Sequence, residues 1–110
     1  MALDHATQGQ PVDVRPYGSA IGQAQSVALF KSSGLEVMRL VLPAGHAMPE
    51  HKVTGEITIH CLEGVVDVDV GGAVTPLAAG HLLYVEGGVP HALLARQAAS
   101  VLVTIALAVA

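Results

Sequence analysis

The segment Val65–Thr75, which reads Val-Val-Asp-Val-Asp-Val-Gly-Gly-Ala-Val-Thr, decides the fold class. Apolar and acidic residues alternate strictly from Val66 to Val70, and such alternation is typical of a β-strand with one buried and one wet face. Gly71-Gly72 then forms a two-residue turn that leads into a second apolar run. The segment therefore predicts a β-hairpin.

The same organisation extends outward along the chain. Gly and Pro recur at short intervals between residues 18 and 90, which leaves room for strands and almost none for helices of usual length. The β-rich runs between these breaks are Ser26–Phe30, Leu35–Leu42, Glu56–Leu62, Val65–Val70, Leu82–Val85, His91–Ala95 and Val101–Val109. About seven to nine short strands with tight turns are typical of an all-β sandwich or barrel.

Composition supports one domain with an aliphatic core. The chain has 110 residues, of which 52% are hydrophobic and only 3% aromatic, so Val, Leu, Ile and Ala must fill the interior. We predict a barrel over residues 17–110. Residues 1–16 form an N-terminal arm that we expect to be poorly ordered or exchanged with a second copy. With only 13% charged residues, a homodimer would cover exposed apolar surface.

Charge and hydropathy argue against two classes of partner. The net charge is −4 and the five Lys and Arg residues are scattered, so we expect no nucleic-acid partner. The apolar end Val101–Ala110 is about half the length of a membrane-spanning helix, so we expect no membrane partner. The first fifteen residues lack the apolar run of a signal peptide, and Cys61 is the single cysteine. These features favour a cytoplasmic location.

Histidines concentrate in two segments, Gly45–Gly64 and Gly80–His91, which read GHAMPEHKVTGEITIHCLEG and GHLLYVEGGVPH. In the first, a histidine precedes a predicted strand and an acid begins that strand. In the second, His91 follows a Gly-Gly-Val-Pro turn. These side chains can form one site only if the barrel brings the two segments together.

Both segments resemble the two sequence motifs of the cupin superfamily, and the resemblance extends from about Leu35 to the C-terminus. In the first motif, G-x5-H-x-H-x3,4-E-x6-G, the matching residues are His51, Glu56 and Gly64, while Pro49 stands at the first histidine position.

In the second motif, G-x5-P-x-G-x2-H-x3-N, the matching residues are Gly80, Gly88 and His91, with Glu86 and Ala95 replacing the proline and the asparagine. The resemblance is to small single-domain bacterial cupins, and it implies an antiparallel jelly-roll β-barrel of about six to ten strands in two facing sheets.

The resemblance also implies a metal site. His51, Glu56 and His91 correspond to three of the four usual ligands, and His60 is the main candidate for the fourth, with His46 a weaker one. Imidazole and carboxylate ligands suit Fe, Mn, Ni, Zn or Cu. Along a regular strand Glu56 and His60 lie about 13 Å apart, so both reach one metal only if the strand is bulged.

A second alignment shifts the site by one residue. Seven residues separate Glu56 from Gly64, and counting back the six of the motif places Ile57 at the carboxylate position. A one-residue slip reverses which side chains face inward. The site would then hold His51 and His91, with or without His60, or no metal.

Four further residues carry expectations about which way they face. Arg39 lies in an apolar strand, and we expect it to face solvent rather than a ligand. Cys61 lies on the face opposite His60 and is expected to be a buried structural thiol. Met48 and Tyr84 are candidates for the mouth of the site or for packing.

The sequence predicts a metal-binding cupin that acts on a small organic molecule as a dioxygenase, isomerase or decarboxylase. Three alternatives remain: acid–base chemistry without metal, a non-catalytic small-molecule binding module, and a barrel with a vestigial metal site. Fold analogy carries this range, since cupin folds host unrelated activities. The substrate, the catalytic residues and the identity of the metal stay open.

Overall fold

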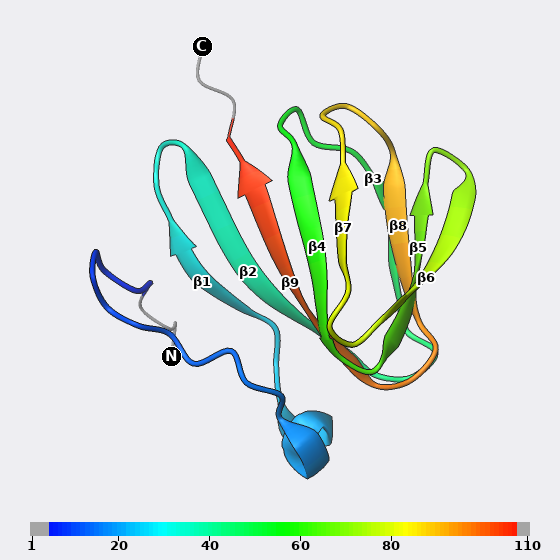
Figure 1. Ribbon diagram of the computed structural model, residues 1–110, viewed down its shortest axis with the longest axis horizontal. Coiled ribbons are helices and arrows are strands. Elements are labelled where there is room, and N and C mark those ends of the chain that lie inside the picture. Colours follow the sequence, from blue (N-terminus) through cyan, green and yellow to red (C-terminus); the bar gives the residue numbers. More distant parts are fainter. Residues whose placement is uncertain (1–4, 108–110) are drawn as a thin grey trace.

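A computed structural model describes residues 5–107, and within that range nine strands follow a short 3-10 helix (Figure 1). The helix η1 spans Gly18–Gln23. The strands are β1 (Val27–Lys31), β2 (Leu35–Leu42), β3 (Ala47–His51), β4 (Ile57–Glu63), β5 (Val65–Val70), β6 (Ala73–Ala78), β7 (Leu82–Val85), β8 (His91–Ala95) and β9 (Ala99–Ala106). No helix in this range is long and apolar enough to cross a membrane.

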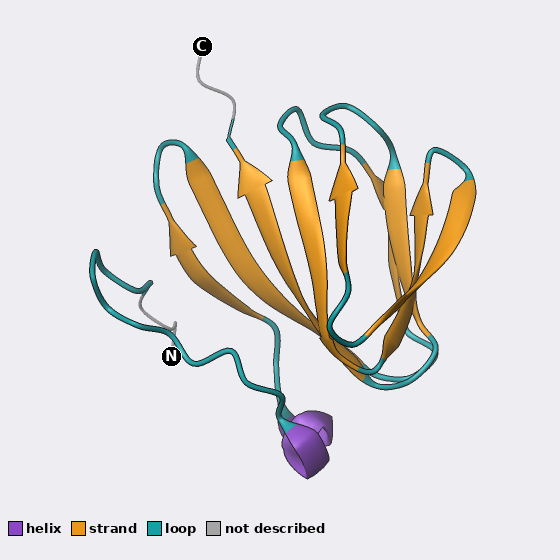
Figure 2. Cartoon of the chain, in the orientation of Figure 1, coloured by secondary structure: helices purple, strands orange, loops and turns teal. Residues whose placement is uncertain are grey.

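The strands form two facing sheets. One sheet has the order β1-β2-β9-β4-β7 and the other β3-β8-β5-β6, and the registered pairs are antiparallel. The sheets meet at the lower end of Figure 2 and separate toward the upper end, where the β3–β4 and β7–β8 connections lie. The all-β jelly-roll prediction is confirmed.

The hairpin that decided the fold class forms as predicted. Val70 pairs with Ala73 across a turn in which Gly71 and Gly72 have φ values of 59° and 95°, a conformation that glycine adopts without steric penalty. Val66 and Val68 are fully buried, whereas the intervening acid Asp67 lies on the outer face. Period-two alternation therefore gives the correct inward face.

The sequence does not predict β3, and it predicts β6 only up to Thr75, as the second arm of the hairpin. β3 includes Pro49 and β6 continues through Pro76, and a proline in a run argues against a central strand. Both strands lie at the edges of the four-stranded sheet, where a missing backbone donor is tolerated. At the C-terminus, residues 108 and 109 of the predicted Val101–Val109 strand lie outside the described range.

The core between the sheets is aliphatic, as the composition predicts. Its buried residues include Ile57, Ile59 and Cys61 of β4, together with Val101 and Val103 of β9. The prediction that Cys61 is a buried thiol is confirmed, and its Sγ donates to the carbonyl of Glu63 at 3.4 Å. Burial raises the pKa of this thiol.

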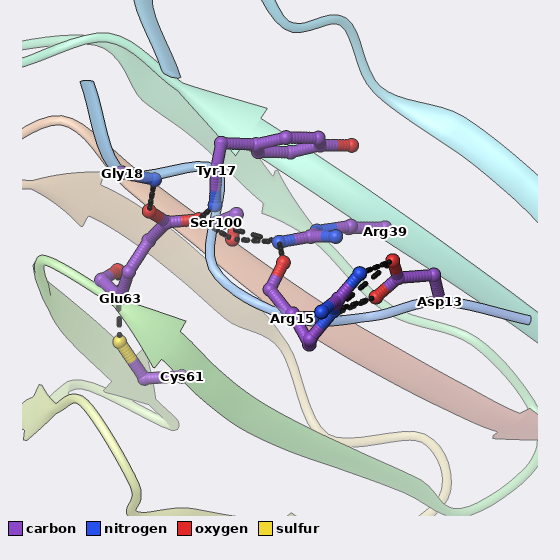
Figure 3. Close-up of polar contacts among 8 residues, drawn as sticks. All are labelled: Asp13, Arg15, Tyr17, Gly18, Arg39, Cys61, Glu63 and Ser100. Carbon is purple, nitrogen blue, oxygen red and sulfur yellow. Dashed lines mark hydrogen bonds and ion pairs between the residues drawn. The ribbon is translucent and has the colours of Figure 1, made fainter. Parts of the chain in front are cut away.

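The expectation that Arg39 faces solvent is wrong. Arg39 lies on the outer face of β2, but the N-terminal segment covers it and only 2% of the residue is exposed (Figure 3). Its Nη2 donates to the backbone oxygen of Arg15 at 2.7 Å and to Ser100 Oγ at 3.1 Å, and it lies 3.3 Å from Glu63 Oε2. The guanidinium carbon lies 3.8 Å from the centroid of the Tyr17 ring. Residues of the N-terminal segment thus contact the outer face of the five-stranded sheet.

Glu63 is the anionic centre of this Arg39 cluster. Its carboxylate accepts hydrogen bonds from the backbone N–H groups of Tyr17 and Gly18 at 2.9 and 3.1 Å, and from the Ser100 hydroxyl at 2.7 Å. Burial, the largest influence, raises the pKa of Glu63, but these hydrogen bonds and the charge of Arg39 together hold the pKa below its usual value.

Candidate functional site

A small cavity lies between the two sheets, toward the end where the β3–β4 and β7–β8 connections are found. It measures about 70 Å³, and its walls are Met38, Leu40, Met48, His51, Val53, Ile57, Ile59, His91, Val103 and Ile105. His51 and His91 are the only ionisable residues in this lining. A polar pair in an apolar chamber is the usual composition of a ligand site.

The barrel brings His51 and His91 together from two adjacent strands. They are direct partners in the pairing of β3 with β8, and their ring centroids lie 4.3 Å apart with the planes tilted by 58°. His91 is 3% exposed, whereas His51 is exposed. The cavity therefore meets solvent on the His51 side.

Both rings are fixed by the same backbone contact. Nδ1 of His51 lies 3.1 Å from the carbonyl oxygen of Pro49, and Nδ1 of His91 lies 3.1 Å from that of Val89. Because a carbonyl oxygen only accepts, each Nδ1 must carry the hydrogen. In the neutral rings, Nε2 then keeps an unprotonated lone pair.

An irregularity in β3 explains how two of its residues enter the same cavity. Met48 and His51 are three positions apart, which in a regular strand places them on opposite faces. The register of β3 against β8 shifts between these two residues, around Pro49 and Glu50. This bulge turns both Met48 and His51 to the inside.

Close backbone packing holds the two loops beside the cavity. The N–H of Gly88 donates to the carbonyl of Val53, a cavity residue, at 2.8 Å. A Cβ on Gly87 would lie 2.3 Å from the carbonyl oxygen of Thr54. Only glycine fits there, so the β3–β4 and β7–β8 connections are locked together beside the two histidines.

The structure does not bring Glu56 and His60 to the cavity. Ile57 and Ile59 line it, and His60 lies on the outer face of β4, where it pairs with Leu82. Glu56 is at the surface and accepts a hydrogen bond of 2.5 Å from the hydroxyl of Tyr84. This contact raises the pKa of Tyr84.

The bulge considered for β4 exists but lies beyond His60. The register of β4 against β9 shifts between Cys61 and Glu63, whereas the pairing from Ile57 to Cys61 is regular. This register agrees with the alignment that places Ile57, separated from Gly64 by six residues, at the carboxylate position. An isoleucine therefore occupies the wall where that alignment expects an acid.

Comparison with known protein families shows to which family the chain belongs. The cupin domain family matches residues 38–106, which is more than half of the chain. This protein belongs to the cupin family. No curated protein matches this cupin.

Solved structures share its fold over most of its length. A conserved protein of unknown function from Streptococcus pyogenes has a TM-score of 0.77 and 19% identity, covering 100% of this chain and 97% of its own. An RmlC-like cupin from Desulfovibrio desulfuricans has a TM-score of 0.73 and 26% identity, covering 88% and 96%. The DMSP lyase DddQ from Ruegeria pomeroyi has a TM-score of 0.68 and 22% identity, covering 74% of this chain and 45% of its own. The fold is thus shared by an enzyme and by proteins without a stated function.

The residues of this cupin do not fit the four-ligand site for Fe, Mn, Ni, Zn or Cu that the motif resemblance implies. Between residues 5 and 107 no three His, Cys, Asp or Glu side chains form a group that could hold a metal ion. Of the four predicted ligands, His51 and His91 meet, while Glu56 and His60 lie outside the cavity. Ile57 supplies hydrocarbon where a carboxylate would be needed.

Sequence reasoning also missed a cavity residue. Met38 lies on the inner face of β2 and lines the chamber opposite β3 and β8. Its position in the apolar run Leu35–Leu42 could have indicated an inward side chain, but nothing in that run distinguishes a cavity wall from the packed core. Met48, a candidate for the mouth, does line the cavity, and Tyr84 lies on the outer face with 54% exposed.

Proposed function

We propose that this cupin is a binding module that holds a small ligand inside its barrel, with Nε2 of His51 and Nε2 of His91 as the polar contacts. One observation carries the proposal: the two rings line one apolar cavity while their Nδ1 atoms are already occupied by carbonyl oxygens. The Nε2 lone pairs are therefore the atoms of these two rings that a ligand can engage.

The size of the cavity limits what it encloses. At about 70 Å³ it holds an ion or a few atoms, whereas pockets that enclose drug-sized ligands measure roughly 300 Å³ or more. The enclosed group must be a hydrogen-bond donor or an electron-pair acceptor, because neutral Nε2 offers only a lone pair. A larger ligand would extend outward past His51.

The placement of Glu56 and His60 favours the binding module over a metal-dependent dioxygenase, isomerase or decarboxylase. Those activities were predicted on a ligand set of four residues, and two of the four lie outside the cavity. A homodimer and a cytoplasmic location stay predictions of the sequence.

The test is a titration of the ¹⁵N-labelled full chain with glycolate, propane-1,2-diol and phenol, each of which joins a hydroxyl donor to a small body. We expect at least one probe to shift the Nε2 resonances of both His51 and His91 and to raise the melting temperature. His51→Ala should abolish the response. His60→Ala, which alters a histidine on the outer face, should keep it.

The proposal is contradicted if all three probes leave both Nε2 resonances unchanged, or if His51→Ala responds like the unaltered chain.

A further inference from the structure

We propose that the ligand of the cavity is a small primary amine, bound as its ammonium ion. Its N–H groups are donated to Nε2 of His51 and Nε2 of His91, and the carboxylate of Glu36 at the rim offsets its charge. This inference rests on the proposed function, because it names the ligand class of the same two histidines. Glu36 lies outside both sequence motifs and is an additional, specificity-determining residue.

The two histidines can accept more hydrogens than a single hydroxyl supplies. Each Nδ1 donates to a carbonyl oxygen, so each neutral ring presents Nε2 as an acceptor. A hydroxyl group carries one hydrogen and satisfies one of these acceptors, whereas a primary ammonium group carries three. The other eight wall residues are Met, Leu, Val and Ile, so none of their side chains donates a hydrogen bond. An ammonium group can therefore engage both rings at once.

The spacing of the rings suits one donor atom between them. The ring centroids lie 4.3 Å apart, and the planes are tilted by 58°. Two N–H groups of one nitrogen, with hydrogen bonds of roughly 2.9 Å at a tetrahedral angle, reach acceptors about 4.7 Å apart. His51 is exposed and His91 is buried, so a third N–H can face water on the His51 side while a small carbon body occupies the apolar chamber.

Glu36 stands on the inner face of β2, beside the cavity wall. It pairs with Ile105 of β9, and Ile105 in turn pairs with Ile57 of β4; both isoleucines line the cavity. Directly paired residues share one face of a sheet, with Cβ atoms about 5 Å apart. Met38, two positions after Glu36, also lines the cavity, as the alternation of a strand requires. Glu36 therefore extends the inner row of the two isoleucines to the rim.

The rim at Glu36 and the two histidines lie at the same end of the barrel. The β1–β2, β3–β4 and β7–β8 connections are together at the upper end of Figure 1. Glu36 follows the first of these connections, His51 precedes the second, and His91 follows the third. A ligand that extends outward past His51 thus leaves the cavity at the end where the carboxylate stands.

The carboxylate of Glu36 is available to a cation. A cation leaves water at a cost that a nearby anion offsets. The cross-strand neighbour of Glu36 on β1 is Lys31, which is exposed. Within residues 5–107, the ion pairs are those of Arg15, Arg39 and Arg96, and they do not include Glu36. A cationic ligand can therefore supply the counter-charge.

The charges around the mouth also favour a cation. Segments 31–36, 50–56 and 86–90 begin or end strands at this end of the barrel. Their charged residues are four acids, Glu36, Glu50, Glu56 and Glu86, and two lysines, Lys31 and Lys52. The whole chain carries a net charge of −4. A surplus of one sign at the opening of an apolar cleft raises the local concentration of ions of the opposite sign.

The experiment is a titration of the ¹⁵N-labelled full chain at constant ionic strength near pH 8, where imidazole is ordinarily neutral and primary amines are charged. Ethylammonium and ethanol differ only in the donor group. We expect ethylammonium to shift Nε2 of both His51 and His91 and to bind at least about tenfold more tightly than ethanol. Tetramethylammonium has the same charge but no N–H, and it should shift neither ring.

Two variants separate the contact with Glu36 from the general charge of the mouth. Glu36→Gln keeps the size of the side chain and should weaken ethylammonium binding about tenfold, in the range of a charged hydrogen bond. It should leave the response to propane-1,2-diol unchanged. The matched control, Glu86→Gln, removes one charge from a loop at the same end and should weaken ethylammonium less than about twofold at physiological salt. Circular dichroism melts check that both variants are folded.

The inference is overturned if ethanol binds as tightly as ethylammonium, if tetramethylammonium shifts both rings, or if Glu36→Gln weakens ethylammonium binding no more than Glu86→Gln does. Each of these results leaves the proposed function intact as long as a hydroxyl probe still shifts His51 and His91. A chain in which neither class of probe affects those histidines would overturn both.

Discussion

Polar groups on the outer side of the five-stranded sheet differ from those in the cavity between the two sheets. On the outer side, Nη2 of Arg39 reaches three acceptors and the Glu63 carboxylate accepts from four groups, so the contacts of this pair are supplied within the chain. In the cavity, His51 and His91 of the four-stranded sheet have one backbone contact each and keep Nε2 free.

This contrast separates structure from function. A polar group whose partners are all supplied by the chain stabilises the fold, so removing it should lower the free energy of unfolding. A polar group held in place at one atom and open at another is prepared for a ligand, and its loss should affect binding more than folding. Substitutions in the Arg39 cluster and in the cavity test whether the first group of residues stabilises the fold and the second binds a ligand.

The largest effect is expected for Arg39→Leu. Removing the cation leaves Glu63, whose side chain is only 14% exposed, without its counter-charge, and breaking such a pair destabilises a protein by about 3 kcal/mol or more. Urea unfolding measures this change. The matched control is Arg96→Leu, because Arg96 pairs with Asp67 with a side chain that is 63% exposed, and we expect a loss below about 1 kcal/mol. Equal losses in the two variants would contradict the structural role of the Arg39 cluster.

Glu63→Gln should have an intermediate effect that depends on pH. The pKa of Glu63 is lowered in the folded chain, so its stabilising contribution is present above the unfolded pKa and is lost as pH falls through the folded pKa. Near neutral pH we expect a loss of about 1.5 kcal/mol, in the range of charged hydrogen bonds. The stability gap to the unaltered chain should narrow below about pH 4. A gap that stays constant from neutral to acid pH would contradict this account.

His91→Leu should change stability little although His91 is buried. The variant removes an imidazole with a free Nε2 and fills the cavity with hydrocarbon, and such exchanges are often neutral or stabilising. We expect the free energy of unfolding to stay within about 1 kcal/mol of the unaltered chain, while ligand response is lost. A destabilisation as large as that of Arg39→Leu would show that His91 is a structural residue.

The smallest effect is expected for Glu56→Gln, which tests the ligand set predicted from the sequence. Because Glu56 contacts Tyr84 at the surface, the unfolding midpoint and the response of the two cavity histidines to the organic probes should stay unchanged. The pKa of Tyr84 should fall toward its usual value, which absorbance titration of the phenol detects. Loss of the probe response in this variant would restore Glu56 as a site residue.

Much of the fold could be predicted because it depends on local pattern. The alternation in Val65–Val70 and the apolar run of Leu35–Leu42 give their strands with the observed bounds. Strand β3 and the part of β6 after Thr75 could not be predicted, because Pro49 and Pro76 are tolerated only at sheet edges and the position of a strand in its sheet is not local information.

The site was predictable in part for the same reason. His51 and His91 flank turns in the two motif segments, and the barrel pairs them directly. The choice between Glu56 and Ile57 depended on a register that a single bulge shifts by one residue, and the sequence does not locate that bulge. The environment of Arg39 was hidden because it is made by Arg15 and Tyr17, which are distant in sequence.

The most direct test of the central claim is the tautomer of the two cavity histidines, measured by long-range ¹H–¹⁵N correlation at about pH 8, where imidazole is ordinarily neutral. The account predicts that His51 and His91 both carry the hydrogen on Nδ1, that Nε2 of both is unprotonated, and that both Nε2 resonances move when ligand is added. Rings that carry the hydrogen on Nε2, or that do not respond when ligand is added, would contradict it.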